Sequence, residues 1–243
     1  MAGNSAKLEK LINDLRGAHG DNLASIVLYG SAATGDQPNA RSDHNLLIAL
    51  NRITTDDLHA AHDALRGWHK LGQPTPVYFT VEELQDAADV FPVEFLQMEK
   101  ARKILFGRDP FELVQISQAN LRHQTEYELR TGLIRLRRLY IPASSSAEKL
   151  SNLMTDSLAS FAALFGAVLI LRQQEPPMSK KETVQATVRL LNLDATPFER
   201  ISKLHTDKAS ALTDEEANRL FGNYMAQIEK VIEAVDRIEE GGN

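Results

Sequence analysis

Two short apolar runs separated by a polar loop constrain the fold of this chain most strongly. Residues 25–29 read Ser-Ile-Val-Leu-Tyr, and residues 46–50 read Leu-Leu-Ile-Ala-Leu. Both runs have the length and composition of buried β-strands. Gly30 and Ser31 end the first run where the backbone must turn sharply, which glycine tolerates at positive φ. The sequence therefore predicts two strands joined by a long polar loop.

The ends of this loop carry residues that suit a phosphate and a metal ion. A helical turn starting at Ser31 would direct N–H groups at the space above the first strand, where an anion such as phosphate is favoured. Gly35 lets the chain leave that turn. Asp43 and Asn45 are two positions apart in an extended segment, so we expect them on one face. The pattern predicts a phosphate site beside the carboxylate of Asp43.

The second position of that face holds an amide where a carboxylate would be more useful. Two carboxylates supply the hard, charged oxygen ligands with which a pair of Mg²⁺ ions holds a triphosphate. Asn45 offers only a neutral carbonyl oxygen. Because about 1.4 kcal/mol corresponds to a tenfold change in rate, losing one bridging carboxylate should slow metal-assisted chemistry by orders of magnitude. Nucleotide binding can persist where catalysis does not.

This stretch resembles the signature of the polymerase-beta-type nucleotidyltransferase superfamily. In that signature a strand ends in Gly-Ser, a Gly follows four residues after the Ser, and Ser-Asp-x-Asp opens the next strand. The matching residues are Gly30, Ser31, Gly35, Ser42 and Asp43, and the departure is Asn45. The arrangement is most similar to minimal and aminoglycoside nucleotidyltransferases, which carry a helical C-terminal domain.

The resemblance implies a function and a role for each matching residue. The protein would bind a nucleoside triphosphate with Mg²⁺ and transfer the nucleoside monophosphate to an acceptor hydroxyl. Gly30, Ser31, Gly35 and Ser42 would bind the nucleotide, and Asp43 would be the catalytic metal ligand, with Asn45 as the degenerate catalytic position. The acceptor remains open between a small molecule, a protein and an RNA end.

A third acid usually completes such a site from a neighbouring strand. The best candidate strand, residues 76–80, reads Pro-Val-Tyr-Phe-Thr and has no acid. Four other carboxylates are candidates for this role, and their spacing does not select among them: Asp36, Glu82, Glu83 and Glu94. Two interpretations therefore remain open, a nucleotidyltransferase with weakened or lost catalysis and a non-catalytic nucleotide-binding or protein-interaction module.

Hydrophobic periodicity divides the chain into two predicted domains, residues 1–108 and 109–243. The first alternates helices, at about 1–17 and 56–70, with strands, and one or two further strands are expected between residues 93 and 106. Asp109 and Pro110 have the chemistry to begin the next helix.

The second half of the chain has helical periodicity only. Its predicted helices cover residues 147–172, 180–192 and 197–206, together with a last helix that starts at a Thr-Asp-Glu-Glu capping box at Thr213. The predicted fold class is α+β, a small nucleotidyltransferase-type mixed sheet followed by an all-α helical bundle.

Composition excludes several classes of protein. The chain has 243 residues and no cysteine, which excludes disulfides and thiolate metal sites. A net charge of −6 argues against bulk nucleic-acid binding. The N-terminal segment reads as an amphipathic helix rather than a signal peptide, and no apolar run is expected to have transmembrane length. We expect a cytoplasmic protein with no membrane partner.

Arg130, Arg135, Arg137 and Arg138 form the strongest basic cluster of the sequence. They are expected to be a solvated helix face or partners of nearby acids, with the wall of a triphosphate or RNA cleft as the alternative.

Three further groups of residues are weaker signals. His59 and His62 are better explained as a charged surface helix than as a metal site, and His44 is expected to pack rather than to catalyse. Arg200 and His205 resemble the Arg-x4-His pattern of HEPN-type ribonucleases, which leaves an RNA-processing role as a lesser alternative.

Overall fold

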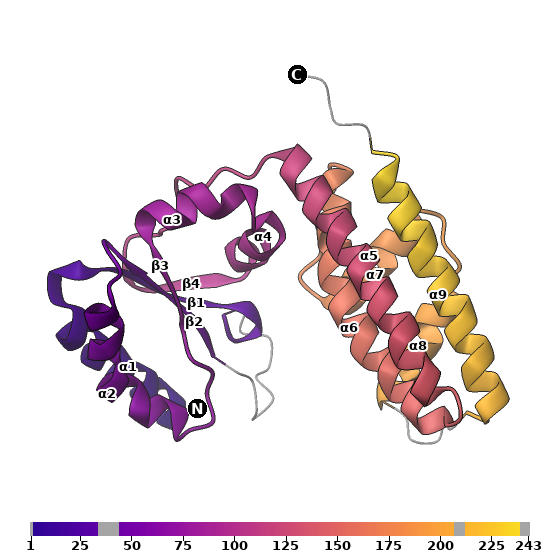
Figure 1. Ribbon diagram of the computed structural model, residues 1–243, viewed down its shortest axis with the longest axis horizontal. Helices are drawn as coiled ribbons and strands as arrows, with labels where there is room; N and C mark the ends of the chain where they lie inside the picture. The colour runs from indigo at the N-terminus through magenta and orange to yellow at the C-terminus, as the bar shows by residue number, and fades with distance from the viewer. Residues whose placement is uncertain (1, 34–43, 207–211, 239–243) are drawn as a thin grey trace. The chain divides into compact units, whose positions relative to one another are not determined.

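The computed structural model describes residues 2–33, 44–206 and 212–238, and it forms two compact units, Met1–Ile116 and Ser117–Asn243 (Figure 1). The division therefore falls after residue 116 and not at residue 108. The reason is that residues 109–116 pack on the first unit, where Phe111 belongs to the core.

A mixed sheet of four strands forms the centre of the first unit (Figure 1). The strands are β1 (Leu23–Tyr29), β2 (Asn45–Leu50), β3 (Val77–Thr80) and β4 (Arg102–Gly107), in the order β3-β2-β1-β4. β1 pairs antiparallel with both β2 and β4, and β2 pairs parallel with β3. The two predicted apolar strands are thus the two central strands of the sheet.

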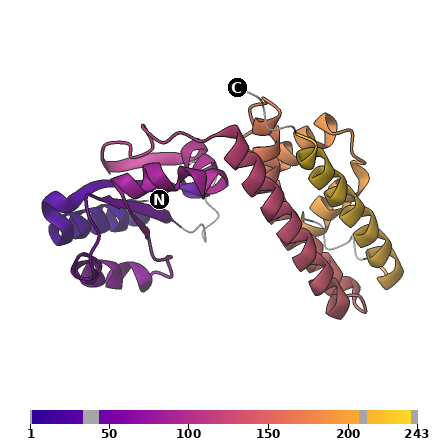
Figure 2. The same cartoon turned by 45° about the horizontal axis from the view of Figure 1, so that its top comes forward.

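Helices cover both faces of this sheet. α1 (Ala2–His19) and α2 (Thr55–His69) pack on one face, while α3 (Val81–Asp86) and α4 (Pro92–Lys100) lie on the other (Figures 1 and 2). The side chains of β1 alternate between the two cores, since Ile26 joins the α1 and α2 core and Val27 joins the α4 core. This alternation accounts for the burial of both central strands.

Two local predictions in this unit are wrong. The apolar run at residues 93–106, predicted as strands, begins as helix α4, because Pro92 occupies its first turn and Val93 and Phe95 supply a buried helical face. Only its last part forms β4. The helix expected at Asp109 begins later, as α5 (Gln118–Ala143), where the side chain of Ser117 accepts the N–H of Asn120 at 3.1 Å.

The second unit is a helical bundle, as predicted. α5 is followed by α6 (Ala147–Leu171), α7 (Lys180–Leu190), α8 (Thr196–Thr206) and α9 (Asp214–Asp236). α6 contacts the other four helices. The predicted capping box is confirmed at α9, where Thr213 accepts the N–H of Glu216 and the Glu216 carboxylate accepts the N–H of Thr213.

Of the helices in the described ranges, α6 has the length and apolar composition required to cross a membrane. The expectation that no apolar run reaches that length is therefore wrong. Its buried side chains include Met154, Phe165 and Val168. α6 contacts four neighbouring helices, so its apolar composition is also explained by a central position in the bundle.

Candidate functional site

The sharp turn predicted after the first strand is present. Gly30 has φ +77°, a left-handed conformation that side chains other than glycine rarely adopt. The N–H of Gly30 donates to the carbonyl of Ala101 at 2.8 Å, and its own carbonyl accepts the N–H of Ala33 at 2.9 Å. The end of β1 is therefore held to the residue that precedes β4.

The same bonds correct the phosphate-site prediction in one respect. A single 3-10 turn, η2 (Gly30–Ala32), follows β1, and no α-helix begins at Ser31. A turn of this length has almost no macrodipole, because that dipole is a sum over many aligned peptides. The Gly30 N–H is also engaged by Ala101. Side chains at this end of the sheet must therefore supply part of any phosphate binding.

Asn45 is the side chain best placed to do so. It is the first residue of β2 and lies directly opposite Tyr29 in the antiparallel ladder. Its side-chain nitrogen Nδ2 is 3.4 Å from the point that a Cβ on Gly30 would occupy. Over the described ranges, no hydrogen bond engages this amide. The degenerate position thus places an uncommitted amide beside the glycine turn.

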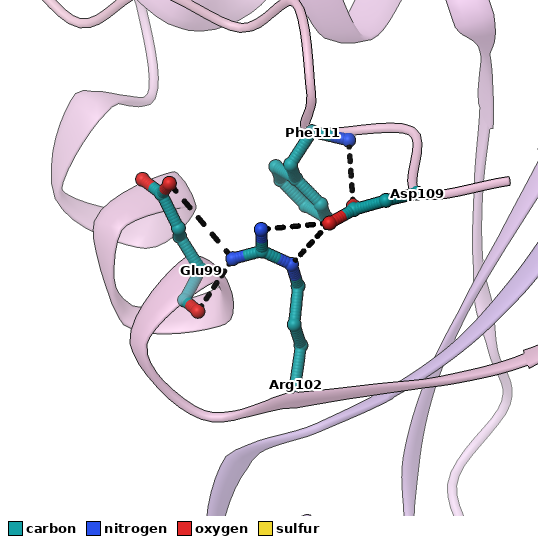
Figure 3. A network of polar contacts seen from close by, with 4 residues as sticks. All are labelled: Glu99, Arg102, Asp109 and Phe111. Atoms are coloured by element: carbon teal, nitrogen blue, oxygen red, sulfur yellow. Dashed lines mark hydrogen bonds and ion pairs between the residues drawn. The ribbon is translucent and has the colours of Figure 1, made fainter.

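A network around Arg102 fixes the strand on the other side of β1 (Figure 3). Arg102 pairs with Tyr29 in the sheet, and its Nε and Nη2 donate to Oδ2 of Asp109 at 3.0 and 2.7 Å. Its Nη1 donates to the carbonyl of Glu99 at 2.5 Å, and the guanidinium lies over the ring of Phe111. Because Ala101, which binds Gly30, lies between Glu99 and Arg102, this network also holds the glycine turn.

Sequence reasoning missed this network. In the sequence, Asp109 has the chemistry of a helix cap, and nothing in the pattern indicates a role for Arg102. Arg102 contacts Glu99 at the end of α4 and Asp109 beyond the end of β4. No sequence motif connects these three residues. Tyr29, which lies between Asn45 and Arg102 in the sheet, is half-buried, and burial raises the pKa of its hydroxyl.

His44 packs, as predicted. Its backbone N–H donates to Oε1 of Gln73 at 2.8 Å, and its ring meets the ring of Trp68 edge-on at 5.9 Å. These contacts hold the start of β2 against α2. They leave His44 no evident part in chemistry.

The described residues do not form a site for two metal ions. Gly35, Asp36, Ser42 and Asp43 lie outside the described residues. Within the described part of the chain, no three His, Asp or Glu side chains gather in a group that could hold a metal ion. Asn45 has no charge, so the described residues do not fit a two-metal site.

The third acid is not found on the neighbouring strand. β3 runs parallel to β2, with Thr80 paired to Leu50, so Glu82 and Glu83 lie beyond the end of the sheet opposite Asn45. Five residue steps at about 3.3 Å place these ends roughly 17 Å apart. Glu83 also accepts the Thr80 N–H at 2.7 Å in a capping box. Both are therefore excluded as stand-ins.

Glu94 is also not where it was expected. It lies in the first turn of α4, not on a strand. The fourth candidate, Asp36, stays outside the described residues. No carboxylate in the described ranges is thereby assigned as the third acid.

The basic cluster of α5 behaves largely as expected. Arg130 pairs with Glu126 at 2.7 Å and with Asp236 at 3.5 Å, and Arg137 pairs with Glu229 at 2.6 Å. Over the described ranges, Arg135 and Arg138 make no ion pair. At least half of the cluster therefore serves as partners of acids on α5 and α9.

The other weak signals gain no support as sites. His59 and His62 are exposed and stack nearly parallel at 6.3 Å on α2. Neither belongs to a potential metal-binding group of three among the described residues. Arg200 lies on α8, and the side chain of His205 is outside the described set, so the ribonuclease pattern stays a prediction.

A mixed four-stranded sheet with a glycine turn at one end, followed in sequence by a helical unit, defines the class of fold. This is a nucleotidyltransferase-type fold, as the resemblance implied.

Comparison with solved structures identifies a particular protein with this fold. The chain is similar to spectinomycin adenyltransferase AAD(9) from Enterococcus faecialis, whose crystal structure contains ATP and spectinomycin, with a TM-score of 0.56. The match covers 93% of this chain and 99% of that chain at 16% sequence identity, which shows the fold alone. No protein-family model and no curated protein matches the sequence.

Proposed function

We propose that this protein binds a nucleoside triphosphate at the end of the sheet formed by Gly30, Ser31 and Asn45. The observation that carries this proposal is the left-handed glycine turn facing Asn45, in a fold shared along nearly the whole of an adenyltransferase. That adenyltransferase was solved with ATP. The match supports the nucleotide as ligand and leaves the reaction to be tested.

As an enzyme, the protein would transfer a nucleoside monophosphate to an acceptor hydroxyl. The oxygen of the acceptor would attack the α-phosphorus, and pyrophosphate would leave. Asp43 is the only carboxylate of the matched motif, since position 45 is Asn. Charge that develops on the phosphates would be poorly neutralised, so we propose slow turnover.

The same feature favours a second candidate, a nucleotide-binding protein without catalysis. Within the described residues, no group of three His, Asp or Glu side chains could hold a metal ion. Fold does not establish activity, because activity depends on the site. Release of pyrophosphate from labelled ATP in the presence of candidate acceptors separates the two candidates, and spectinomycin is the first acceptor to test because the similar structure contains it.

Calorimetric titration with ATP, GTP, CTP and UTP tests the shared part of both proposals. We expect binding of at least one triphosphate, and an affinity loss of about tenfold or more in Ser31→Ala, since a hydrogen bond to a charged group contributes about 1.5–3 kcal/mol. Ser25→Ala is the matched control, because the Ser25 hydroxyl bonds the Phe106 carbonyl at 3.0 Å near the other end of β1. Absence of binding at millimolar nucleotide would refute the proposal.

A further inference from the structure

Asn45 departs from the acid of the motif, and the structure shows where its amide lies. Nδ2 approaches the Cβ position of Gly30 to 3.4 Å. In the described part of the chain the amide has no hydrogen-bond partner. A side chain in contact with its neighbours but lacking a polar partner has donors to offer a ligand.

The glycine turn needs such donors. Its Gly30 N–H is bonded to Ala101, and η2 is too short to add a useful dipole. The nearby Arg102 guanidinium is directed at Asp109 and Glu99. A phosphate beside Gly30 would therefore find the Asn45 amide as its side-chain donor on β2.

We infer that Asn45 is a specificity-determining residue that donates a hydrogen bond to a nucleotide phosphate in place of ligating a second metal ion. The inference rests on the proposed function and adds to it. An amide at this position adds no negative charge to that of Asp43, so a polyphosphate meets less repulsion than it would with a carboxylate at position 45. A carboxylate there would repel the phosphate unless Mg²⁺ lay between them. The wild-type site therefore binds nucleotide with less dependence on Mg²⁺ than a site with a carboxylate at position 45.

Titration calorimetry with ATP, in EDTA and in excess Mg²⁺, tests the inference in three variants. Wild type should bind ATP in both conditions, and its affinity should differ less between them than that of Asn45→Asp. In EDTA, the ATP affinity of Asn45→Asp should be about tenfold or more below that of wild type. In excess Mg²⁺ this affinity should recover, because the carboxylate then shares a cation with the phosphates. Asn45→Ala should lose ATP affinity by about tenfold in both conditions, because the alanine side chain has neither a hydrogen-bond donor nor an oxygen that could bind a metal ion.

Asn51→Asp is the matched control. It adds the same charge just beyond the other end of β2, where the Asn51 amide bonds the Asp21 carbonyl at 3.0 Å. Its ATP affinity should match wild type in both conditions. Trp68 fluorescence verifies that each variant is folded, because Trp68 is the only tryptophan and is buried in the first unit.

Two outcomes overturn the inference, and they are distinguishable. If wild type binds ATP only with Mg²⁺, or if Asn45→Asp keeps wild-type affinity in EDTA, then Asn45 is not the donor and the proposed function stands. If wild type binds no nucleotide in either condition, the proposed function itself fails and the inference fails with it.

Discussion

Three of the four described glycines with positive φ allow backbone strain to be separated from steric overlap. Gly20, Gly30 and Gly107 have φ of +52°, +77° and +76°. Among the described residues, a Cβ on Gly20 would meet nothing within 4 Å, and one on Gly30 would meet Nδ2 of Asn45 at 3.4 Å. A Cβ on Gly107 would lie 1.9 Å from the carbonyl oxygen of Ala24.

The expected losses follow from these distances. Gly20→Ala and Gly30→Ala should each lower the free energy of unfolding by about 1–2 kcal/mol, the strain of a left-handed alanine. Gly107→Ala carries the same strain and must also move β4 away from β1, where Gly107 pairs with Ser25. A total loss of about 4 kcal/mol or more is expected, at the upper end of single substitutions.

Urea unfolding followed by Trp68 fluorescence measures these losses. Trp68 is buried in the α2 core, and its indole N–H donates to the Pro74 carbonyl at 3.0 Å, so the signal reports the first unit. ATP affinity should fall in Gly30→Ala, whose methyl group would lie beside Asn45, and should not change in Gly20→Ala. Equal losses of stability in Gly107→Ala and Gly30→Ala would refute the reasoning.

The remaining predictions concern protonation and the helical unit. Burial lowers the pKa of His19 below its ordinary value of 6.5, and Asp57 opposes the shift. The unfolded state therefore binds more protons, and the first unit should lose stability as pH falls through about 6.5. His19→Asn should remove this pH dependence from urea midpoints measured at about pH 8 and pH 5.5, and an unchanged dependence would exclude His19 as its cause. Phe165→Ala should lower the free energy of unfolding by about 3–5 kcal/mol, because Phe165 is fully buried and packs against Phe161 and Phe198. Denaturant unfolding followed by circular dichroism measures this loss, and a loss below about 1 kcal/mol would contradict that packing. Thr213→Ala should lower the free energy of unfolding by about 1 kcal/mol, and Thr213→Ser should lower it much less. Equal losses in the two variants would show that the capping hydroxyl is unimportant.

Sequence predicted the elements whose signals are local. The strands at β1 and β2, the turn at Gly30 and the capping box at Thr213 depend on residues close together in the chain, and the structure has all of them. The apolar run at residues 93–106 misled the prediction, because apolar residues without clear alternation fit a buried helix and a strand alike.

The candidate site was predicted less completely for a physical reason. The bond from Gly30 to Ala101 and the pairing of Tyr29 with Arg102 require β4 to lie beside β1, and chain order does not reveal that neighbourhood. Sheet topology likewise decides that Glu82 and Glu83 lie at the end opposite Asn45. The pairing of strands that are distant in sequence therefore decides which carboxylates can serve as the third acid, and sequence spacing alone does not.

The central position of α6 has a consequence for synthesis on the ribosome. Its contacts with α9 form only after residues 214–236 have left the ribosome, which at roughly 5–20 residues per second takes several seconds after α6 itself emerges. During that interval a helix apolar enough to enter a bilayer has part of its surface uncovered. Nascent chains that stop before α9 should therefore be clients of chaperones, and the yield of this protein in cells should depend on how quickly its last helix is made.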